Sequence, residues 1–320
     1  MRTYVLRRLA ISVPVLLGIT IVVFLLVNLT PGDPITAYLS PEQLAAAGPD
    51  YIEVRRQQLG LDQPLPVRYF YWLRHLVTGD FGYSVQTGEP VLDQIGERMG
   101  PTLRLTIAAQ MLAITVGITL GVVSAIKQYS LLDYLITTFN FVSISIPSFF
   151  LGLGLIYIVS LKLGILPPNG MNTVGGSAGL VDSLRHLILP ALVLSLPSIA
   201  VFARYTRASM RDTLDQDYVM VARAKGLHST SVITRHAFPN AITPLITIIA
   251  LGLPGLFGGA VITEQIFSWP GMGTLAITSI SMRDYPVLMG LTTITAVIVL
   301  ASNLLADVLY ALADPRIRYR

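Results

Sequence analysis

The side chains of this chain that could do chemistry are few and widely spaced. The four histidines, His75, His186, His228 and His236, have no carboxylate or thiol partner at the spacing of a metal site or catalytic pair. Each is therefore expected to be an interfacial or solvated side chain. There is no cysteine, and there is no G-x-x-x-x-G-K-[ST] loop to cradle ATP phosphates. We expect no catalytic residue, no bound cofactor and no metal site in this chain.

Charged and polar side chains are also frequent in the loop at residues 210–240, which reads MRDTLDQDYVMVARAKGLHSTSVITRHAFPN. Asp217–Lys225 contains few helix breakers and is predicted to be helical. Gly226 then permits a sharp turn at a positive φ.

The second half of this loop predicts another short helix. Ser229 or Thr230 could cap its start, and it should end before Pro239, because the residue preceding a proline avoids the α conformation. The loop is thus either a helix-turn-helix at the membrane surface or a basic amphipathic segment that holds anionic lipid headgroups. Its residues alone favour neither interpretation.

The elements around this loop are apolar enough to lie in lipid. Of 320 residues, 53% are apolar and 12% are charged, whereas soluble domains carry about 25% charged residues. The mean hydropathy is +0.65, and about 20 apolar residues suffice for a helix to cross a bilayer. We therefore predict an all-α polytopic membrane protein with about six transmembrane helices. Six suitable runs are found at residues 9–29, 102–126, 131–161, 187–209, 241–263 and 287–312.

The distribution of lysine and arginine predicts the topology of these spans. Arginines precede the first span and follow the last, and further basic residues occupy the loop between spans four and five. Since Lys and Arg concentrate in cytoplasmic loops, both termini and the 210–240 loop are expected to be cytoplasmic. Ionisable residues are rare inside the spans, which argues against a proton- or sodium-coupled carrier.

The predicted topology divides the chain into three parts. Residues 1–30 form an N-terminal transmembrane helix, residues 31–100 form a small exported lobe, and residues 101–320 form a five-helix core. The lobe contains nine acidic residues and five arginines, and its length and turn residues suggest a folded structure. It is expected to contact an extracytoplasmic protein or to guard the outer mouth of the pathway.

Two small-residue motifs have alternative interpretations. Gly117 and Gly121 form G-x-x-x-G in the second span, and Gly255 and Gly259 repeat it in the fifth. Such spacing lets helices approach closely. The contact is either packing within the bundle, which is commoner, or a seam with a partner subunit.

The 210–240 loop resembles the EAA loop of permeases from binding-protein-dependent ATP-binding-cassette importers. Ala222 fits the second alanine of that pattern, Gly226 its glycine, and the segment ending at Pro239 its closing element. Met220 and Val221 replace the glutamate and first alanine. Those departures resemble the peptide-transport branch. Its pattern is matched at Asp217, Tyr218, Val219, Ala222, Arg223, Ala224, Lys225, Gly226, Leu227, Arg235, His236, Ala237, Asn240 and Ala241.

Further blocks, in the same order along the chain, are similar to the dipeptide/oligopeptide/nickel permease family. They cover nearly the whole chain. They are Leu29–Pro34, Gly79–Ser84, Glu264–Gly273, Arg283–Pro286 and Asp314–Arg318.

The resemblance implies a type I ABC importer permease (MetI-like) fold in a bacterial or archaeal inner membrane. It implies a second homologous permease, two cytoplasmic ABC ATPases that bind ATP and Mg²⁺, and an extracytoplasmic solute-binding protein. No nucleic acid is expected. The chain would form half of the pathway for di- or oligopeptides and couple to the ATPases through residues 217–240. The implied ATPase-coupling residues are Asp217, Tyr218, Ala222, Arg223, Ala224, Lys225, Gly226, Leu227, Arg235 and His236.

Three alternatives remain open. Inside the family, the solute could be nickel, a chelated metal or another small solute, although no histidine or carboxylate cluster lines a predicted span. Outside it, the chain could be a carrier or channel acting alone. A membrane enzyme is a distant third, because no nucleophile and base form a visible pair.

Overall fold

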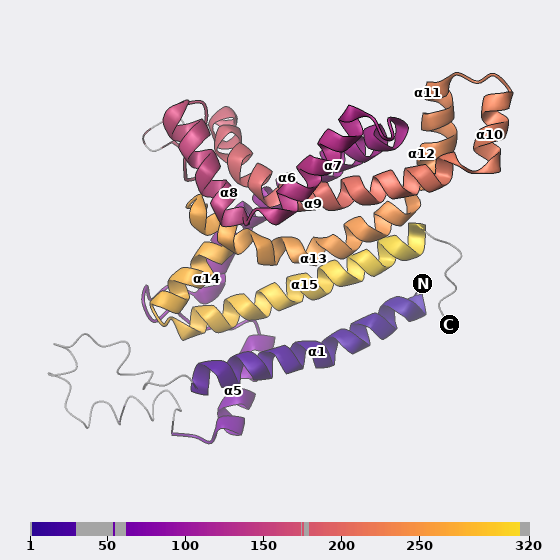
Figure 1. Cartoon of the computed structure of the whole chain (residues 1–320). Helices are drawn as coiled ribbons and strands as arrows, with labels where there is room; N and C mark the ends of the chain where they lie inside the picture. The colour runs from indigo at the N-terminus through magenta and orange to yellow at the C-terminus, as the bar shows by residue number, and fades with distance from the viewer. Residues whose placement is uncertain (1, 30–53, 55–61, 174, 176–178, 314–320) are drawn as a thin grey trace. The chain divides into compact units, whose positions relative to one another are not determined.

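The computed structural model describes residues 2–29, 54, 62–173, 175 and 179–313, and these ranges are helical apart from turns and one isolated bridge between Tyr83 and Pro90 (Figure 1). The all-α prediction is confirmed. In chain order the elements are α1 (Arg2–Leu29), α5 (Leu65–Val77), α6 (Val91–Ile126), α7 (Leu131–Ser145), α8 (Ser148–Leu155), the π-helix η1 (Ile156–Lys162), α9 (Leu180–Leu214), α10 (Asp217–Ala224), α11 (Ser229–Ser231), the π-helix η2 (Val232–Ala237), α12 (Phe238–Ala241), α13 (Thr243–Ile266), α14 (Met272–Ser281) and α15 (Tyr285–Ala313).

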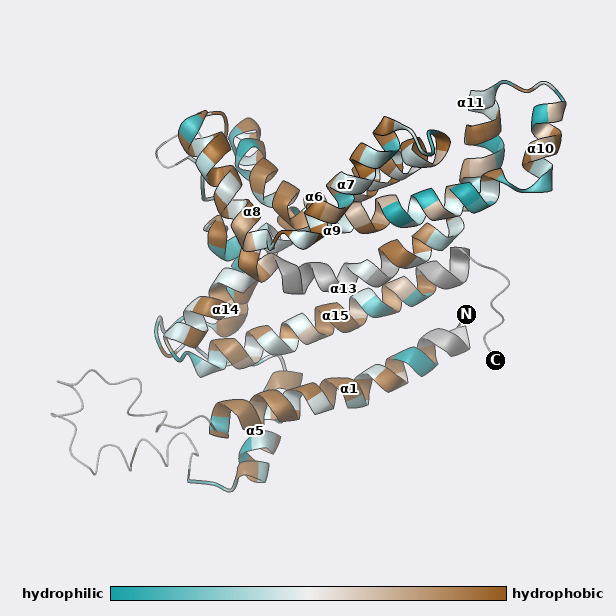
Figure 2. Cartoon of the chain, in the orientation of Figure 1, coloured by the Kyte–Doolittle hydropathy of each residue, from teal (hydrophilic) through white to brown (hydrophobic). Residues whose placement is uncertain are grey.

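Long apolar helices occupy the predicted spans, as the hydropathy colouring in Figure 2 shows. Among the described residues, four helices are long and apolar enough to cross a membrane: Leu6–Leu29, Val91–Ile126, Leu180–Leu214 and Tyr285–Val308. A bent pair, α7 with α8 and η1, counts as a fifth span if it is taken as one. The predicted run at residues 241–263 corresponds to α13, which is 24 residues long.

The third predicted span is not one straight helix. Its two halves, Leu131–Ser145 and Ser148–Lys162, are bent by 106°. Ile146 is extended, with a ψ of 124°, and Pro147 precedes α8. The residue before a proline avoids the α conformation, and the proline ring removes a helical donor. Pro147 therefore ends α7 and starts a new helix in another direction.

The chain divides into two compact units whose boundaries fall inside helices. The larger unit comprises the described parts of Met1–Leu9, Gly100–Thr274 and Ile298–Arg320, and the smaller comprises those of Ala10–Met99 and Leu275–Val297.

In the larger unit, α6 and α9 approach each other closely at the glycines of the second span. A Cβ atom on Gly117 would lie 2.8 Å from Phe202 Cβ, and one on Gly121 would lie 2.6 Å from the carbonyl oxygen of Ala203. These separations are too short for any side chain, so the motif at Gly117 and Gly121 serves packing within the chain. The side chains around Gly255 and Gly259 lie outside the described residues.

A buried carboxylate joins α6 to α13 and the start of α14 in the same unit. Glu264 is fully buried. It accepts hydrogen bonds from Thr102 Oγ1 at 2.6 Å, Gly273 N at 2.7 Å and Thr274 N at 3.2 Å. Thr102 Oγ1 in turn accepts from Met272 N at 2.8 Å. The carboxylate thus caps the first turn of α14, where free backbone N–H groups favour a negative charge.

In the smaller unit, the loop between α5 and α6 is fastened to the start of α15. Ser84 Oγ donates to the buried carboxylate of Asp284, and Gln86 Nε2 donates to the carbonyl of Met282 at 2.9 Å. Helix α6 begins at Val91, well before the predicted span start at residue 102. Its first turns also pack near α15, because a Cβ on Gly290 would lie 2.7 Å from Val91 Cγ1.

We predict that Gly121→Ala destabilises the protein. The added methyl would overlap the Thr206 side chain and the carbonyl of Ala203, so α6 and α9 must separate. Gly96→Ala is the matched control, since it lies on the same helix with nothing within 4 Å of its Cβ position. Thermal unfolding of the purified chain in detergent should show a lower midpoint for Gly121→Ala alone. Equal midpoints for the two variants would contradict the packing argument.

We predict that Thr102→Val also destabilises the protein, because it removes a hydroxyl that serves both Glu264 and the backbone of Met272. Leaving a buried polar group unsatisfied costs about 1–3 kcal/mol. Thr119→Val is the control, because Thr119 is exposed on the same helix and bonds only its own backbone, at Thr115 O. The same unfolding assay should separate the two variants, and a loss no greater than that of Thr119→Val would refute the role of Thr102.

Candidate functional site

The candidate site is the hairpin that follows α9, made of α10, the turn at Gly226 and the second arm α11–η2–α12 (Figure 1). Gly226 has a φ of +73°, a left-handed conformation that glycine adopts without steric cost. Nothing lies within 4 Å of its Cβ position. The backbone conformation therefore requires the glycine, and steric crowding does not. The loop thus has the helix-turn-helix conformation that was one of its two interpretations.

Two details of the predicted second arm are wrong. Its cap is His228, whose Nδ1 accepts from Thr230 N at 3.3 Å, so neither Ser229 nor Thr230 is the capping residue. The arm also continues past Pro239, which occupies the first turn of α12. A proline is tolerated in a first turn because its missing N–H would be unpaired there, and the π-helix η2 shifts the backbone hydrogen bonds just before it.

The inner faces of the two arms pack against each other. Val219, Ala222 and Val232 are buried together, with Leu214 at the end of α9 against them. Val219 and Ala222 are three residues apart, so they lie on one face of α10. Burial of a valine side chain contributes about 1.5–3 kcal/mol. The hairpin is therefore an element with its own small core.

The base of the second arm is anchored to the ends of α6 and α9. Ala237 and Ala241 form a buried cluster with Ala125 of α6 and Met210 of α9. Ser209 Oγ also donates to the carbonyl of Ala241 at 2.7 Å. The hairpin is thus joined to α9 by buried contacts and a hydrogen bond.

The outer face of the hairpin is exposed and mixed in character. Tyr218, Met220, Val221 and Leu227 are 44%, 53%, 53% and 42% exposed. Among the predicted coupling residues, the exposed ones are Asp217, Tyr218, Arg223, Ala224, Lys225, Gly226, Leu227 and Arg235. Exposed apolar side chains beside cationic ones are typical of a surface that binds a protein partner.

The remaining two predicted residues have other positions. Ala222 is buried between the arms, where it cannot contact a partner and instead supports α10 from within. His236 is half-buried on η2. The predicted set therefore combines exposed residues with one that supports them from within.

An ion pair that the sequence analysis missed fixes α9 near the hairpin. Arg207 on α9 donates from Nε and Nη2 to the two carboxylate oxygens of Asp133 on α7, at 2.9 and 2.8 Å. Asp133 also accepts from Ser124 Oγ and from the backbone N–H of Tyr129. The sequence near Asp133 does contain a helix cap, Ser130, which accepts from Asp133 N. That cap does not reveal that Arg207, 74 positions away, is the partner of Asp133.

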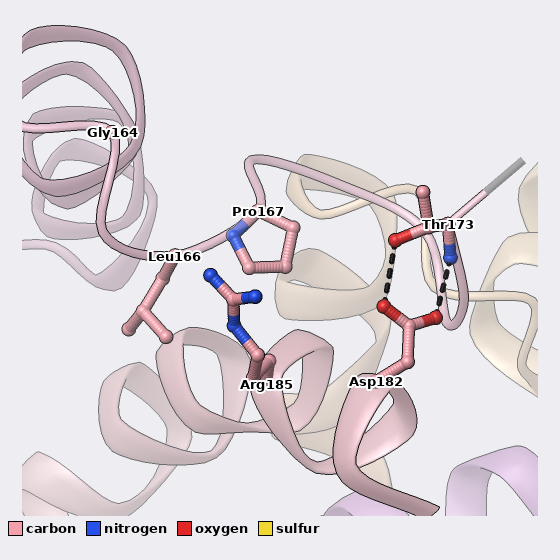
Figure 3. Close-up of a pocket in the computed structure, with 6 residues that line it drawn as sticks. All are labelled: Gly164, Leu166, Pro167, Thr173, Asp182 and Arg185. Atoms are coloured by element: carbon pink, nitrogen blue, oxygen red, sulfur yellow. Dashed lines mark hydrogen bonds between the residues drawn. The ribbon is translucent and has the colours of Figure 1, made fainter. Parts of the chain in front are cut away.

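A small pocket of about 200 Å³ lies between the segment after η1 and the first turns of α9 (Figure 3). Its polar side chains already have partners within the chain. Asp182 accepts from Thr173 N at 2.7 Å and Thr173 Oγ1 at 2.6 Å, and Arg185 Nη2 donates to the carbonyl of Ile165 at 2.9 Å. These bonds stabilise the loop, and they leave the pocket without a built ligand site.

Two histidines differ from the expectation that all are unpartnered interfacial or solvated side chains. His186 is 6% exposed. Its Nδ1 lies 2.9 Å from the carbonyl of Asn169, and because a carbonyl only accepts, Nδ1 carries a proton. His75 lies 3.0 Å from Asp80. In the described part of the chain, no group of three or more His, Asp or Glu side chains is placed to hold a metal ion.

Comparison with known proteins supports one family over the whole chain. Residues 117–319 match the model for "binding-protein-dependent transport system inner membrane component", and residues 1–106 match that of the corresponding N-terminal region. The chain is 44% identical to the oligopeptide transport system permease protein AppB of Bacillus subtilis, over 100% of both chains. It is 41% identical to the glutathione transport system permease protein GsiC of Escherichia coli K12, again over 100% of both.

Solved structures agree on the fold. A chain of the MetNI methionine ABC transporter in an inward-facing conformation superposes with a TM-score of 0.56 at 14% identity, covering 70% of this chain and 97% of that one. A chain of an amino acid ABC transporter gives a TM-score of 0.54 at 16% identity, covering 69% and 94%. The predicted ABC importer permease fold is thereby confirmed. With the full-length relatives and both family models, these likenesses identify the chain as a multi-pass membrane protein that belongs to the family of binding-protein-dependent transport system inner membrane components.

Proposed function

We propose that this chain forms half of the translocation pathway of an ATP-driven peptide importer and that the α10–α12 hairpin couples it to cytoplasmic ATPase subunits. The hairpin carries the proposal: its inner side is anchored to α6 and α9, whereas its outer side is exposed. The chain would assemble with a second homologous permease, two ATPases that bind ATP and Mg²⁺, and an extracytoplasmic solute-binding protein. It would itself catalyse no reaction and bind no cofactor.

The assignment of a peptide substrate is supported by relatives. The permeases at 41–44% identity are named for oligopeptides and for glutathione, which is itself a small peptide. Nickel or a chelated metal is the second candidate, because the resemblance noted in the sequence includes nickel permeases. Uptake of labelled oligopeptide and of nickel chelate by the reconstituted importer, each with the cognate binding protein, tests both. Uptake of the nickel chelate alone would refute the peptide assignment.

The predicted topology gives the hairpin and both termini a cytoplasmic position and makes residues 31–100 an exported lobe. The basic residues of the hairpin and of the chain ends support this orientation. The lobe would then face the binding protein. Its described part, α5 and the loop to α6, is a folded structure held on the start of α15.

We predict that Gly226→Val leaves the chain inserted in the membrane but uncouples it. A branched side chain at a φ of +73° costs about 1–2 kcal/mol, and the two arms would change their angle to relieve that strain. Gly226→Asn is the matched control, since asparagine tolerates the left-handed conformation. Solute-stimulated ATPase activity of the assembled importer should be lost in Gly226→Val and largely kept in Gly226→Asn. Stimulation at the wild-type level in Gly226→Val would be incompatible with the proposed role of the turn.

We predict that the double substitution Arg223→Glu with Lys225→Glu weakens the attachment of the ATPase subunits. Both side chains are exposed on the outer face of the hairpin, and reversing their charge turns attraction to an acidic partner surface into repulsion. Lys127→Glu is the control, because Lys127 is an exposed cation outside the hairpin. Copurification from detergent should fall for the double variant only, and an equal fall for Lys127→Glu would indicate a general charge effect.

A further inference from the structure

Helix α5 is strongly apolar, yet none of its residues is buried in the structure. Phe70, Tyr71 and Val77 are 66%, 55% and 79% exposed. The helix reads LPVRYFYWLRHLV and so combines a run of aromatic residues with basic ones and no acidic residue. A helix of this composition in water would leave large apolar side chains hydrated.

One face of α5 packs against the last turns of α1, within the smaller unit (Figure 1). The ring of Phe24 lies 5.4 Å from that of Tyr69 and 5.8 Å from that of Trp72. The hydroxyls of Thr20 and Tyr69 are 2.9 Å apart. Thr20 precedes the end of α1 at Leu29 by about 13 Å, at 1.5 Å per residue. In a membrane-spanning α1, this contact therefore extends from within one leaflet of the bilayer to the membrane surface near Leu29.

A polar contact marks the surface end of this packing. Arg68 Nη2 donates to the side-chain oxygen of Asn28, one residue before the end of α1. Partial burial lowers the pKa of the Arg68 guanidinium from its ordinary value, but an arginine remains a cation at neutral pH. A positive charge is thus held where the apolar part of α1 ends.

The exposed side chains of α5 form two stripes with different chemistry. Phe70 and Val77 are seven residues apart and lie on one stripe, while Tyr71 and His75 are four apart and lie on another. The first stripe has apolar side chains at both ends and the exposed Arg74 between them, and the second ends in hydroxyl and imidazole groups. With the α1-facing side, α5 has one face for protein, one for an apolar environment and one for a polar environment.

We propose that α5 is an interfacial helix that lies at the boundary between lipid headgroups and acyl chains near the Leu29 end of α1, with Phe70 and Val77 directed toward the acyl chains. Tyrosine and tryptophan prefer this depth because their rings are apolar and their tips polar. Arg68 and Arg74 are complementary to lipid phosphate. The side of α1 turned away from α5 is also apolar and exposed, since Val22, Leu26 and Leu29 are 55%, 65% and 68% exposed.

This placement has a consequence for the exported segment. The loop after α5 is bonded to the start of α15 through Ser84 and Asp284. If α5 lies at the bilayer surface, that loop is held close to the membrane as well, whichever solute the importer carries. The proposal therefore does not depend on the peptide assignment or on the coupling role of the hairpin.

The absence of cysteine in this chain makes the test direct. Phe70→Cys and His75→Cys would each carry a nitroxide, with the chain assembled with its partner subunits in vesicles of phosphatidylethanolamine and phosphatidylglycerol. Collision rates are measured with oxygen, which concentrates in lipid, and with a water-soluble nickel chelate. The ratio of oxygen to chelate collisions should be several-fold higher at Phe70→Cys than at His75→Cys. Val77→Cys should reproduce the result of Phe70→Cys.

Two other outcomes would overturn the proposal. Equal and high chelate collision at both positions would place α5 in water. Low collision with both reagents at Phe70→Cys and Val77→Cys would show that protein covers the apolar stripe, and cross-linking from these cysteines would then identify the second permease or the binding protein as the occupant. Solute uptake by each labelled variant verifies that the importer is folded and assembled. His75→Cys removes only an exposed pair with Asp80, which contributes little to stability.

Discussion

The larger unit depends on the close approach of α6 and α9 at Gly117 and Gly121. Helices pack about 8–10 Å apart, depending on the side chains between them, and here the two glycines contribute no side chain from α6 to the contact. The part of α6 before these glycines supplies Thr102 to the Glu264 network, and its last turn supplies Ala125 to the base of the hairpin. A change in the α6–α9 distance would therefore disturb both contacts.

The hairpin is joined closely to α9. Its arms share a buried core, and its base is bonded to α9 through Ser209 and packed against Met210. Arg207, a little earlier on α9, donates two hydrogen bonds to Asp133. Such bidentate pairs are geometrically specific. The hairpin, α9 and the first turn of α7 are thus joined by direct contacts. This contiguity supports the proposed coupling role.

Local signals in the sequence were sufficient for much of this structure. Helix α10, the positive φ of Gly226 and the positions of the long apolar helices follow from propensity, glycine freedom and hydrophobic length. The sequence did not reveal the partner of Asp133 or the burial of His186, because those contacts join residues that are distant in the chain or form within an irregular loop. The continuation past Pro239 was also missed, because a π-helix shifts hydrogen bonds in a way that residue preferences do not encode.

The buried carboxylates of this chain have structural partners. Among the described residues, the buried carboxylates are Asp133, Glu264 and Asp284. Each accepts hydrogen bonds from a segment distant in sequence: Asp133 from Arg207, Glu264 from Thr102 and Asp284 from Ser84. Carriers that use ion gradients keep such groups available along the pathway, whereas these three are engaged in holding helices and loops together. These three buried carboxylates therefore serve the architecture of the chain.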